Sequence, residues 1–223
     1  MQQDLFSLAD DAGLEAVAGG RGRRLGPGTV LFPGLAGAIA PYLIEAIGHI
    51  TAAAPFRHMQ TSGGQRISVA MTNCGSLGWV SDRAGYRYQA TDPASGTPWP
   101  ALPGSFRQLA QEAAALAGFA GFDPDACLIN RYVPGARMSL HQDRDERDLS
   151  QPIVSVSLGL PVVFQLAGDT RTGPRLNLPL AHGDVLVWGG PDRLRYHGVR
   201  TLAGGEHPLT GACRYNLTFR RAA

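Results

Sequence analysis

The triplet His141-Gln142-Asp143 places an imidazole and a carboxylate two positions apart. On extended backbone, residues i and i+2 point to the same side, so His141, Asp143 and the preceding Ser139 would share one face. Two histidines and one carboxylate that leave open coordination positions form the facial triad of non-haem Fe(II) oxygenases. The same ligand types also hold catalytic zinc. The triplet therefore predicts a metal centre without deciding its chemistry.

A third ligand must come from elsewhere in the chain. The other histidines are His49, His58, His182, His197 and His207. His49 lies in a predicted helix, His182 in a turn before an apolar strand, and His207 in a polar loop before a proline. His197 follows a strand-like Leu-Arg-Tyr segment and precedes a glycine, so it can reach a site in a β core.

The segment 213–220 alternates polar and apolar residues without a break. One face carries Arg214, Asn216, Thr218 and Arg220, and the other carries Cys213, Tyr215, Leu217 and Phe219. A half-buried strand with water on its polar side explains this pattern. Two arginine forks can instead hold a small dicarboxylate such as 2-oxoglutarate in bidentate geometry, with donors added by Asn130 and Tyr132 of a neighbouring strand.

Two helices are predicted before the strands that carry these residues. Segment 34–54 is typical of a helix whose regular part begins near Pro41, because proline is well placed in a first helical turn. A second helix is predicted to be capped by Ser105 and closed by Gly118. Residues 1–25 show no strong periodicity and are predicted to be a loose N-terminal arm, followed by one domain over residues 26–223.

A hairpin and an irregular loop are predicted between the two helices. Residues 55–80 have strand-like spacing around a Ser-Gly-Gly turn at residues 62–64. Residues 81–104 are rich in Gly, Pro, Tyr and Arg and are predicted to be a long irregular loop, a kind of segment that is often functional.

After the second helix, short strand-like runs separated by turn residues dominate the chain. They cover residues 126–133, 137–143, 153–160, 162–168, 175–180, 184–190, 194–199 and 213–220. This spacing is typical of an all-β sandwich or barrel. We therefore predict an α+β fold, in which a double-stranded β-helix (jelly roll) core follows N-terminal helices and a β-hairpin lid.

Composition bounds the class of protein. The chain has 223 residues, 44% hydrophobic and 17% charged, which predicts one globular domain. It has no apolar run of membrane-spanning length and no signal-peptide pattern, so we expect a soluble, cytoplasmic protein. Its three widely spaced cysteines predict neither a disulfide framework nor a cysteine zinc site. A net charge of +2, with every basic residue an arginine, neither requires nor excludes a nucleic-acid partner.

Several segments resemble, in order, those of the bacterial AlkB family. The most specific are NRYVPGARMSLHQDRDE (130–146) and RYNLTFR (214–220), and the resemblance runs from about residue 55 to residue 221. It implies an Fe(II)- and 2-oxoglutarate-dependent dioxygenase that uses O2. Such an enzyme removes alkyl groups from bases such as 1-methyladenine and 3-methylcytosine, in single- or double-stranded DNA or in RNA, as direct-reversal repair. The products would be an aldehyde, succinate and CO2.

The resemblance also implies residue roles. Iron would be bound by His141, Asp143 and His197. 2-Oxoglutarate would be anchored by Arg214, with help from Asn130, Tyr132 and Asn216, and Arg220 would lie near its iron end. The damaged base would contact Trp79, His141 and Asp145, with Thr61, Met71, Tyr86 and Arg171 as lid and rim residues and Glu146 grouped with the substrate contacts. In the lid, predicted at about residues 55–90, Gln65 stands where the bacterial relatives carry an aromatic residue.

The residues leave two other functions open. The same oxygenase core can act on a protein side chain or a small metabolite, and only Trp79, Tyr86, Asp145 and Arg171 favour a flipped cationic base. A non-enzymatic β domain with an empty pocket is the second alternative. The complete triad together with the arginine strand argues against it. A monomer is the expected state.

Overall fold

The computed structural model describes residues 22–223, and its largest element is an eight-stranded antiparallel sheet. In spatial order the strands are β1 (Arg23–Gly26), β2 (Thr29–Phe32), β12 (Val185–Trp188), β9 (Ile153–Gly159), β14 (Arg214–Arg220), β7 (Ala126–Tyr132), β4 (Arg66–Gly75) and β3 (Arg57–Gln60). Strand β14 lies between β9 and β7, so its side chains are surrounded on both edges by paired backbone.

A smaller sheet packs against one face of the large one. Its strands, in spatial order, are β11 (Arg175–Leu180), β10 (Val162–Ala167), β13 (His197–Val199) and β8 (Met138–His141). Phe164 and Leu166 of the small sheet join Ile153, Leu186 and Trp188 of the large sheet in one buried cluster. Two antiparallel sheets packed over a shared core form the predicted jelly roll.

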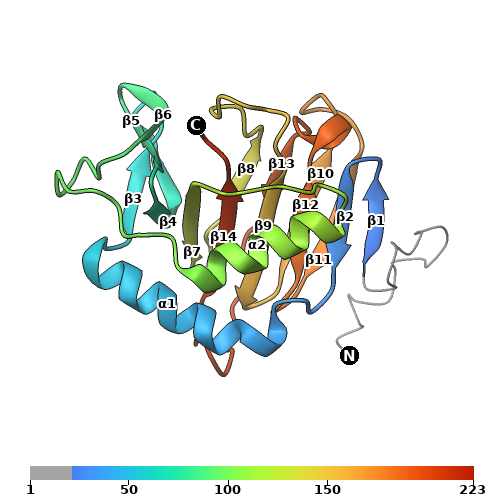
Figure 1. The fold of residues 1–223 in the computed structure, drawn as a ribbon, viewed down its shortest axis with the longest axis horizontal. Helices are drawn as coiled ribbons and strands as arrows, with labels where there is room; N and C mark the ends of the chain where they lie inside the picture. Colours follow the sequence, from blue (N-terminus) through green and yellow to red (C-terminus); the bar gives the residue numbers. More distant parts are fainter. Residues whose placement is uncertain (1–21) are drawn as a thin grey trace.

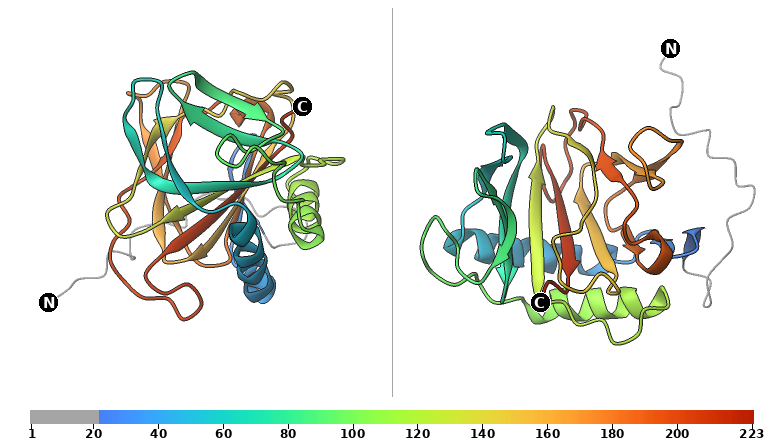
Figure 2. Two further views of the ribbon diagram at one scale, coloured as in Figure 1. Left: turned by 90° about the vertical axis from the view of Figure 1, so that its left-hand side faces the viewer. Right: turned by 90° about the horizontal axis from the view of Figure 1, so that it is seen from above.

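Helices α1 (Ala40–Ala53) and α2 (Gly104–Leu116) cover the other face of the large sheet (Figure 1). Leu43, Ile47 and Ile50 of α1 recur at helical spacing and are buried against that face. The left-hand view of Figure 2 shows that both helices lie on one side of the strands. Within the part of the chain that the structure describes, no helix has the length and apolarity that crossing a membrane would need.

The helix ends confirm one expectation and correct another. A 3-10 turn at Gly37–Ile39 precedes α1, and Pro41 lies in its first turn as predicted. Ser105 is not the cap of α2, because the helix begins at Gly104 after an extended Pro103 and has no side-chain cap. Gly118, at φ +96°, ends that helix as expected, since this backbone conformation favours glycine.

The predicted lid hairpin is present, but the segment after it is more regular than expected. β3 pairs with β4 around the turn at residues 61–65. The prediction of a wholly irregular loop over residues 81–104 is wrong in its first part, because β5 (Gly78–Asp82) and β6 (Gly85–Gln89) form a second hairpin. Gly85, at φ +105°, supplies the turn.

The N-terminal boundary of the folded domain also differs from the prediction. Arg23–Gly26 is strand β1 and pairs with β2, so the predicted loose arm over residues 1–25 does not extend through residues 23–25. Residues 1–21 lie outside the described part of the chain. Cys74 and Cys127 are buried on adjacent strands with free thiols, as expected for small apolar side chains, and Cys213 is partly buried.

Candidate metal and co-substrate site

Three potential metal ligands meet at one end of the small sheet. His141 ends β8 and is the cross-strand neighbour of His197, which begins β13. Nε2 of His141 lies 3.5 Å from Oδ1 of Asp143, and Nε2 of His197 lies 3.7 Å from Oδ2. Ligand atoms of the three residues lie within 4.8 Å of one another. The sheet register therefore brings the predicted third histidine to the predicted pair.

Backbone carbonyls orient both imidazoles. Nδ1 of His141 lies 2.9 Å from the carbonyl oxygen of Ser139, and Nδ1 of His197 lies 3.1 Å from that of Arg195. A carbonyl only accepts, so Nδ1 must carry the proton in each ring. In the neutral tautomer Nε2 then presents its lone pair toward Asp143, as a metal ligand requires.

The third potential ligand, Asp143, is held as a carboxylate by a neighbouring arginine. Nη2 of Arg220 donates to Oδ2 of Asp143 over 2.6 Å, and Nε donates to the same oxygen over 3.2 Å. Burial alone would raise the pKa of Asp143, but the charges of Arg220 and His197 hold it well below its usual range. Asp143 is thus ionised and ready to bind a cation.

The pKa values of the two histidines are shifted in opposite directions. Burial lowers the pKa of His197, and the neighbouring His141 lowers it further. Burial also acts against protonation of His141, but its hydrogen bond to Asp143 and the charge of that carboxylate outweigh burial and raise its pKa. A protonated His141 would shield Asp143, so a metal ion must displace that proton to bind.

A buried arginine without a counter-charge lies on the polar face of β14. Arg214 is 1% exposed, its Nη2 donates to Oγ of Ser157 over 3.0 Å, and its guanidinium carbon lies 5.0 Å from the ring centre of Tyr132. Nε and Nη1 are buried and have no partner. Burial lowers the pKa of Arg214. A buried cation with two free donors fits a carboxylate of a bound ligand.

Two facing asparagines line the same polar face. Asn130 and Asn216 are cross-strand neighbours on β7 and β14, 3.4 Å apart through Nδ2 and Oδ1. Asn216 also donates to Oγ of Ser155 over 2.8 Å, whereas Oδ1 of Asn130 is buried without a partner. The polar face of β14 therefore faces the space between the sheets. The alternative of a strand whose polar side meets water is wrong.

The lid hairpin β5–β6 carries the predicted aromatic contact. The ring of Trp79 stacks on Tyr86 with centroids 5.7 Å apart and planes 13° from parallel. Its Nε1 donates to Oδ2 of Asp145 over 2.8 Å. The side chain of Asn73 fixes the backbone of Trp79 on both sides, accepting from its N–H and donating to its carbonyl. Trp79 is thus held rigidly beside a carboxylate two residues beyond Asp143.

Glu146, which we grouped with the substrate contacts, has a different environment. Its side chain is 2% exposed and lies 2.9 Å from Nη2 of Arg193 and 3.2 Å from Nε of Arg220. It also accepts a hydrogen bond from the hydroxyl of Tyr88 over 2.7 Å. Burial is the main reason that the pKa of Tyr88 is well above its usual value. These contacts engage both oxygens of the carboxylate, so Glu146 positions Arg220, and its contact with a substrate stays a prediction.

The other predicted rim residues are spread over the lid and the small sheet. Thr61 lies in the turn of the first lid hairpin, where its hydroxyl accepts from the N–H of Gln65. Met71 is 1% exposed within the core between the sheets. Arg171 is exposed, with its guanidinium carbon 5.4 Å from the ring centre of Tyr196. These three do not meet one another at the triad, and their contacts with a substrate stay predictions.

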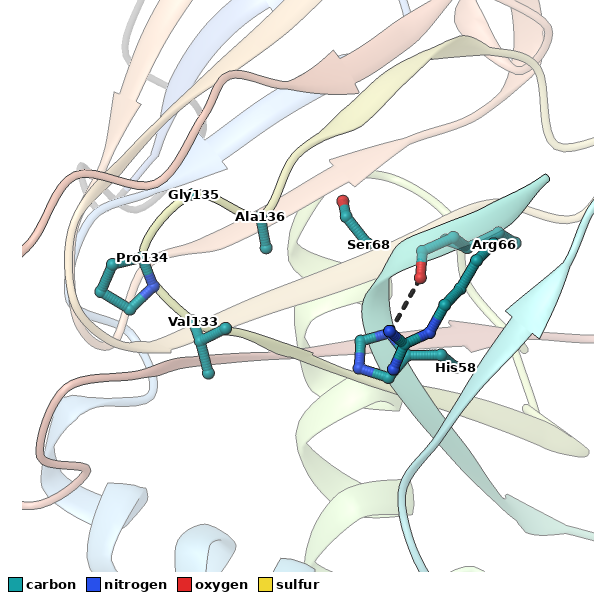
Figure 3. Close-up of a pocket in the computed structure, with 8 residues that line it drawn as sticks. His58, Arg66, Ser68, Val133, Pro134, Gly135 and Ala136 are labelled. Carbon is teal, nitrogen blue, oxygen red and sulfur yellow. Dashed lines mark hydrogen bonds between the residues drawn. The ribbon is translucent and has the colours of Figure 1, made fainter.

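A hollow of about 390 Å³ separates the first lid hairpin from the β7–β8 loop (Figure 3). His58, Arg66 and Ser68 line it from the hairpin, and residues 133–136 line it from the loop. Nδ1 of His58 lies 2.8 Å from the carbonyl oxygen of Ile67, which fixes the ring within the hairpin. His58 lies on β3 of the lid, and the group of potential metal ligands found in the described residues does not include it.

Sequence patterns missed several residues of the site. Ser157 contacts Arg214, Arg193 contacts both Glu146 and the carbonyl oxygen of Asp143, and Nε1 of Trp188 is buried without a partner near His197. Ser157 had a usable signal, because it alternates with apolar residues along β9 and lies on the same face of the sheet as Asn216, its cross-strand neighbour on β14. Arg193 had none, since its partners are about 50 residues away in the chain.

The chain was compared with family models and with known proteins, and both comparisons indicate the same family. Residues 28–220 match the model of the 2OG-Fe(II) oxygenase superfamily. The alpha-ketoglutarate-dependent dioxygenase AlkB of Escherichia coli is 57% identical over 198 residues, covering 89% of this chain and 92% of that protein.

Two more distant relatives extend the comparison. A protein of Arabidopsis thaliana named DNA N(6)-methyladenine demethylase ALKBH1C is 35% identical over 60% of this chain and 35% of its own length. The solved structure of OsALKBH1 superposes with a TM-score of 0.79 at 28% identity, covering 90% of this chain and 99% of that one.

Proposed function

The chain belongs to the AlkB branch of the 2OG-Fe(II) oxygenase superfamily, and from that premise we propose that it removes alkyl groups oxidatively from N-alkylated bases in DNA. The enzyme is an Fe(II)- and 2-oxoglutarate-dependent dioxygenase. The substrates we propose are bases such as 1-methyladenine and 3-methylcytosine.

The site residues fit both bound groups. The His-Asp-His donor set suits Fe(II) with open positions, and the two unpartnered donors of Arg214 suit one carboxylate of 2-oxoglutarate. Together with O2, iron and 2-oxoglutarate supply the oxidation of the N-alkyl carbon, and succinate, CO2 and an aldehyde are the products. We assign His141, Asp143 and His197 to the metal, and Arg214, Tyr132, Asn130 and Asn216 to the co-substrate.

The choice of substrate rests on one observation, the contact of Trp79 with Asp145. A base that is presented to a buried metal must leave its stack, and an aromatic face helps to hold it. The alkylated rings of 1-methyladenine and 3-methylcytosine are cationic. The indole N–H of Trp79 donates to the carboxylate of Asp145, so a cation over the ring face is favoured by cation–π attraction and by the nearby negative charge. Tyr86, stacked behind Trp79, keeps that face in place.

The chain's own residues bind and orient in this proposal. Arg220 and Glu146 hold Asp143 in one position, and the backbone carbonyls of Ser139 and Arg195 hold both imidazoles. The lid hairpins place Trp79 beside the loop that carries Asp143 and Asp145. Buried alignment of this kind lowers the entropic part of the barrier.

A repair assay tests the proposal. Purified protein, Fe(II), ascorbate and 2-oxoglutarate are mixed with a single-stranded oligonucleotide that carries one 3-methylcytosine, and the product is weighed by mass spectrometry. We expect loss of one methylene, abolished in His141→Ala and in the absence of 2-oxoglutarate. His49→Ala is the matched control, since that side chain is 80% exposed on α1. No mass loss, with succinate still formed on a different substrate, would overturn the nucleic-acid assignment and keep the oxygenase.

Three finer predictions accompany this function. RNA is a further candidate substrate, because the proposed contacts recognise the alkylated base and not the sugar. A monomeric state and a cytoplasmic location stay predictions from the sequence.

A further inference from the structure

The outer face of the small sheet carries a second feature, which none of the proposed metal ligands or co-substrate residues lines. A hollow of about 460 Å³ lies over β8, β10 and β13, the strands that lie behind the large sheet in Figure 1. Four arginines line it, namely Arg137, Arg171, Arg175 and Arg200. All four are exposed, and no carboxylate is among the described residues that line the hollow.

These four arginines differ from six others in the described part of the chain. Arg57, Arg87, Arg107, Arg193, Arg195 and Arg220 each lie within ion-pair distance of a carboxylate. None of the four around the hollow forms an ion pair with a carboxylate in residues 22–223, and only the arginines at 171 and 175 contact each other, through Nη2 of Arg175 and the carbonyl oxygen of Arg171. In a chain of net charge +2, four unneutralised cations around one concave surface are a local excess that attracts a polyanion.

Two closely packed strands beneath the hollow connect it to the metal site. Gly198 lies between His197 and Val199, and a Cβ there would come within 2.8 Å of the carbonyl oxygen of Met138. The same two strands that carry the metal-ligand histidines at one end lead to Arg137 and Arg200 at the other. Arg200 follows His197 by three positions and Arg137 precedes His141 by four, so at a rise of about 3.3 Å per residue the arginines lie about 10–13 Å from the ligands along the strands.

We propose that this hollow binds the sugar–phosphate backbone of the nucleic-acid strand that carries the damaged base, several nucleotides away from that base. The inference rests on the proposed function and extends it to a second contact region, in which Arg175 and Arg200 are the distinguishing residues. Phosphates of one strand repeat every 3.4 Å along a helix axis, so about three or four of them span the distance from the site to the hollow. Guanidinium forks bind phosphate in bidentate geometry and impose no base preference.

The test measures binding of undamaged single-stranded DNA of about fifteen nucleotides against salt, between about 50 and 200 mM. We expect Arg175→Gln/Arg200→Gln to reduce the slope of log K against log salt by about 1.4, since each single-strand phosphate contact contributes about 0.7. Arg24→Gln/Arg107→Gln, with the same change of charge on β1 and α2, should keep the wild-type slope. Arg175→Lys/Arg200→Lys should restore most of the slope.

A trinucleotide with a central 3-methylcytosine separates this inference from the proposed function. It is too short to reach the hollow, so we expect wild type and Arg175→Gln/Arg200→Gln to repair it equally, while the variant loses repair of the longer oligonucleotide at limiting substrate. An unchanged salt slope in the variant, with trinucleotide repair intact, would contradict DNA binding in the hollow and would leave the proposed function unaffected. An equal loss of slope in the control pair would also overturn it. Failure of the wild type both to repair the trinucleotide and to bind DNA would overturn both.

Discussion

Nη2 of Arg220, the last residue of β14, lies 2.6 Å from Oδ2 of Asp143, so the C-terminal strand directly holds the carboxylate of the metal triad. The same guanidinium reaches Glu146, which is held in turn by Arg193 and by Tyr88 of the second lid hairpin. A continuous path of buried polar contacts therefore joins the lid to the metal ligands. Each charge on this path has a partner of opposite sign, which lowers the cost of burying it.

The first prediction concerns Arg220→Lys. Lysine keeps the positive charge but cannot contact Asp143 and Glu146 at once in the fixed fork of a guanidinium. We expect Fe(II) affinity to fall by about 10- to 100-fold, the usual effect of removing a contact that orients a metal ligand. Competition with a chromogenic chelator measures this directly. Arg107→Lys, at an ion pair on α2, is the matched control, and an iron affinity equal to wild type in Arg220→Lys would exclude an orienting role.

The second prediction concerns Arg214→Met. In the absence of bound carboxylate, Arg214 is a buried cation with two unpartnered donors, so an apolar side chain of similar length should raise the melting temperature of the ligand-free protein. Affinity for 2-oxoglutarate should fall at least 30-fold, since loss of a buried charge pair costs about 2 kcal/mol or more. Thermal shift with and without 2-oxoglutarate reads both effects. If 2-oxoglutarate raised the melting temperature of the variant as much as that of wild type, Arg214 would not be the anchor of the co-substrate.

Local alternation made much of this site predictable. The polar face of β14 and the His141–Asp143 pair follow from the two-residue period of strands, and both were recognised from residue types alone. The alternation did not reveal whether the polar face of β14 contacts water or the protein interior. Water was one option, and only the packing of the small sheet against the large one shows that Arg214 and Asn216 face a closed interior.

The other features that the sequence did not reveal have three separate causes. The buried contacts of Glu146 had no local signal, because its partners Tyr88 and Arg193 are 58 and 47 residues away. The β5–β6 hairpin was missed because Gly, Arg and Tyr content suggested a loop, although Tyr86 and Tyr88 alternate as strand residues do. Ser105 was chosen as a cap by residue type, whereas the helix begins one residue earlier.

The third prediction separates the two roles of Trp79. Trp79→Ala removes the aromatic face, and we expect affinity for an alkylated oligonucleotide to fall by about 1–3 kcal/mol, the usual worth of one base stacked on an aromatic ring. Trp79→Phe keeps a face but removes the Nε1–H that donates to Asp145, so a smaller loss is expected. Fluorescence anisotropy with alkylated and plain oligonucleotides measures both. Equal losses on the two oligonucleotides would indicate a structural role for the ring and not base recognition.

The fourth prediction is a pH dependence of stability that arises far from the metal. Nδ1 of His182 accepts a hydrogen bond from the N–H of Gly159 over 3.0 Å, and its ring stacks on His207 with centroids 4.4 Å apart. Partial burial, and then the neighbouring His207, lower the pKa of His182 below its ordinary value of 6.5, against a smaller opposing effect of Asp184.

The fold therefore favours the neutral ring, whereas the unfolded chain gains a proton as the pH falls through about 6.5. Stability from this group is complete above that pH and is lost progressively below it, toward the lowered pKa of the folded state. We expect the melting temperature to fall between neutral and mildly acidic pH. His182→Asn, which keeps an acceptor for Gly159 but does not titrate, should flatten that part of the profile, with His49→Asn as the exposed control. An identical slope in His182→Asn and wild type would place the dependence in other groups.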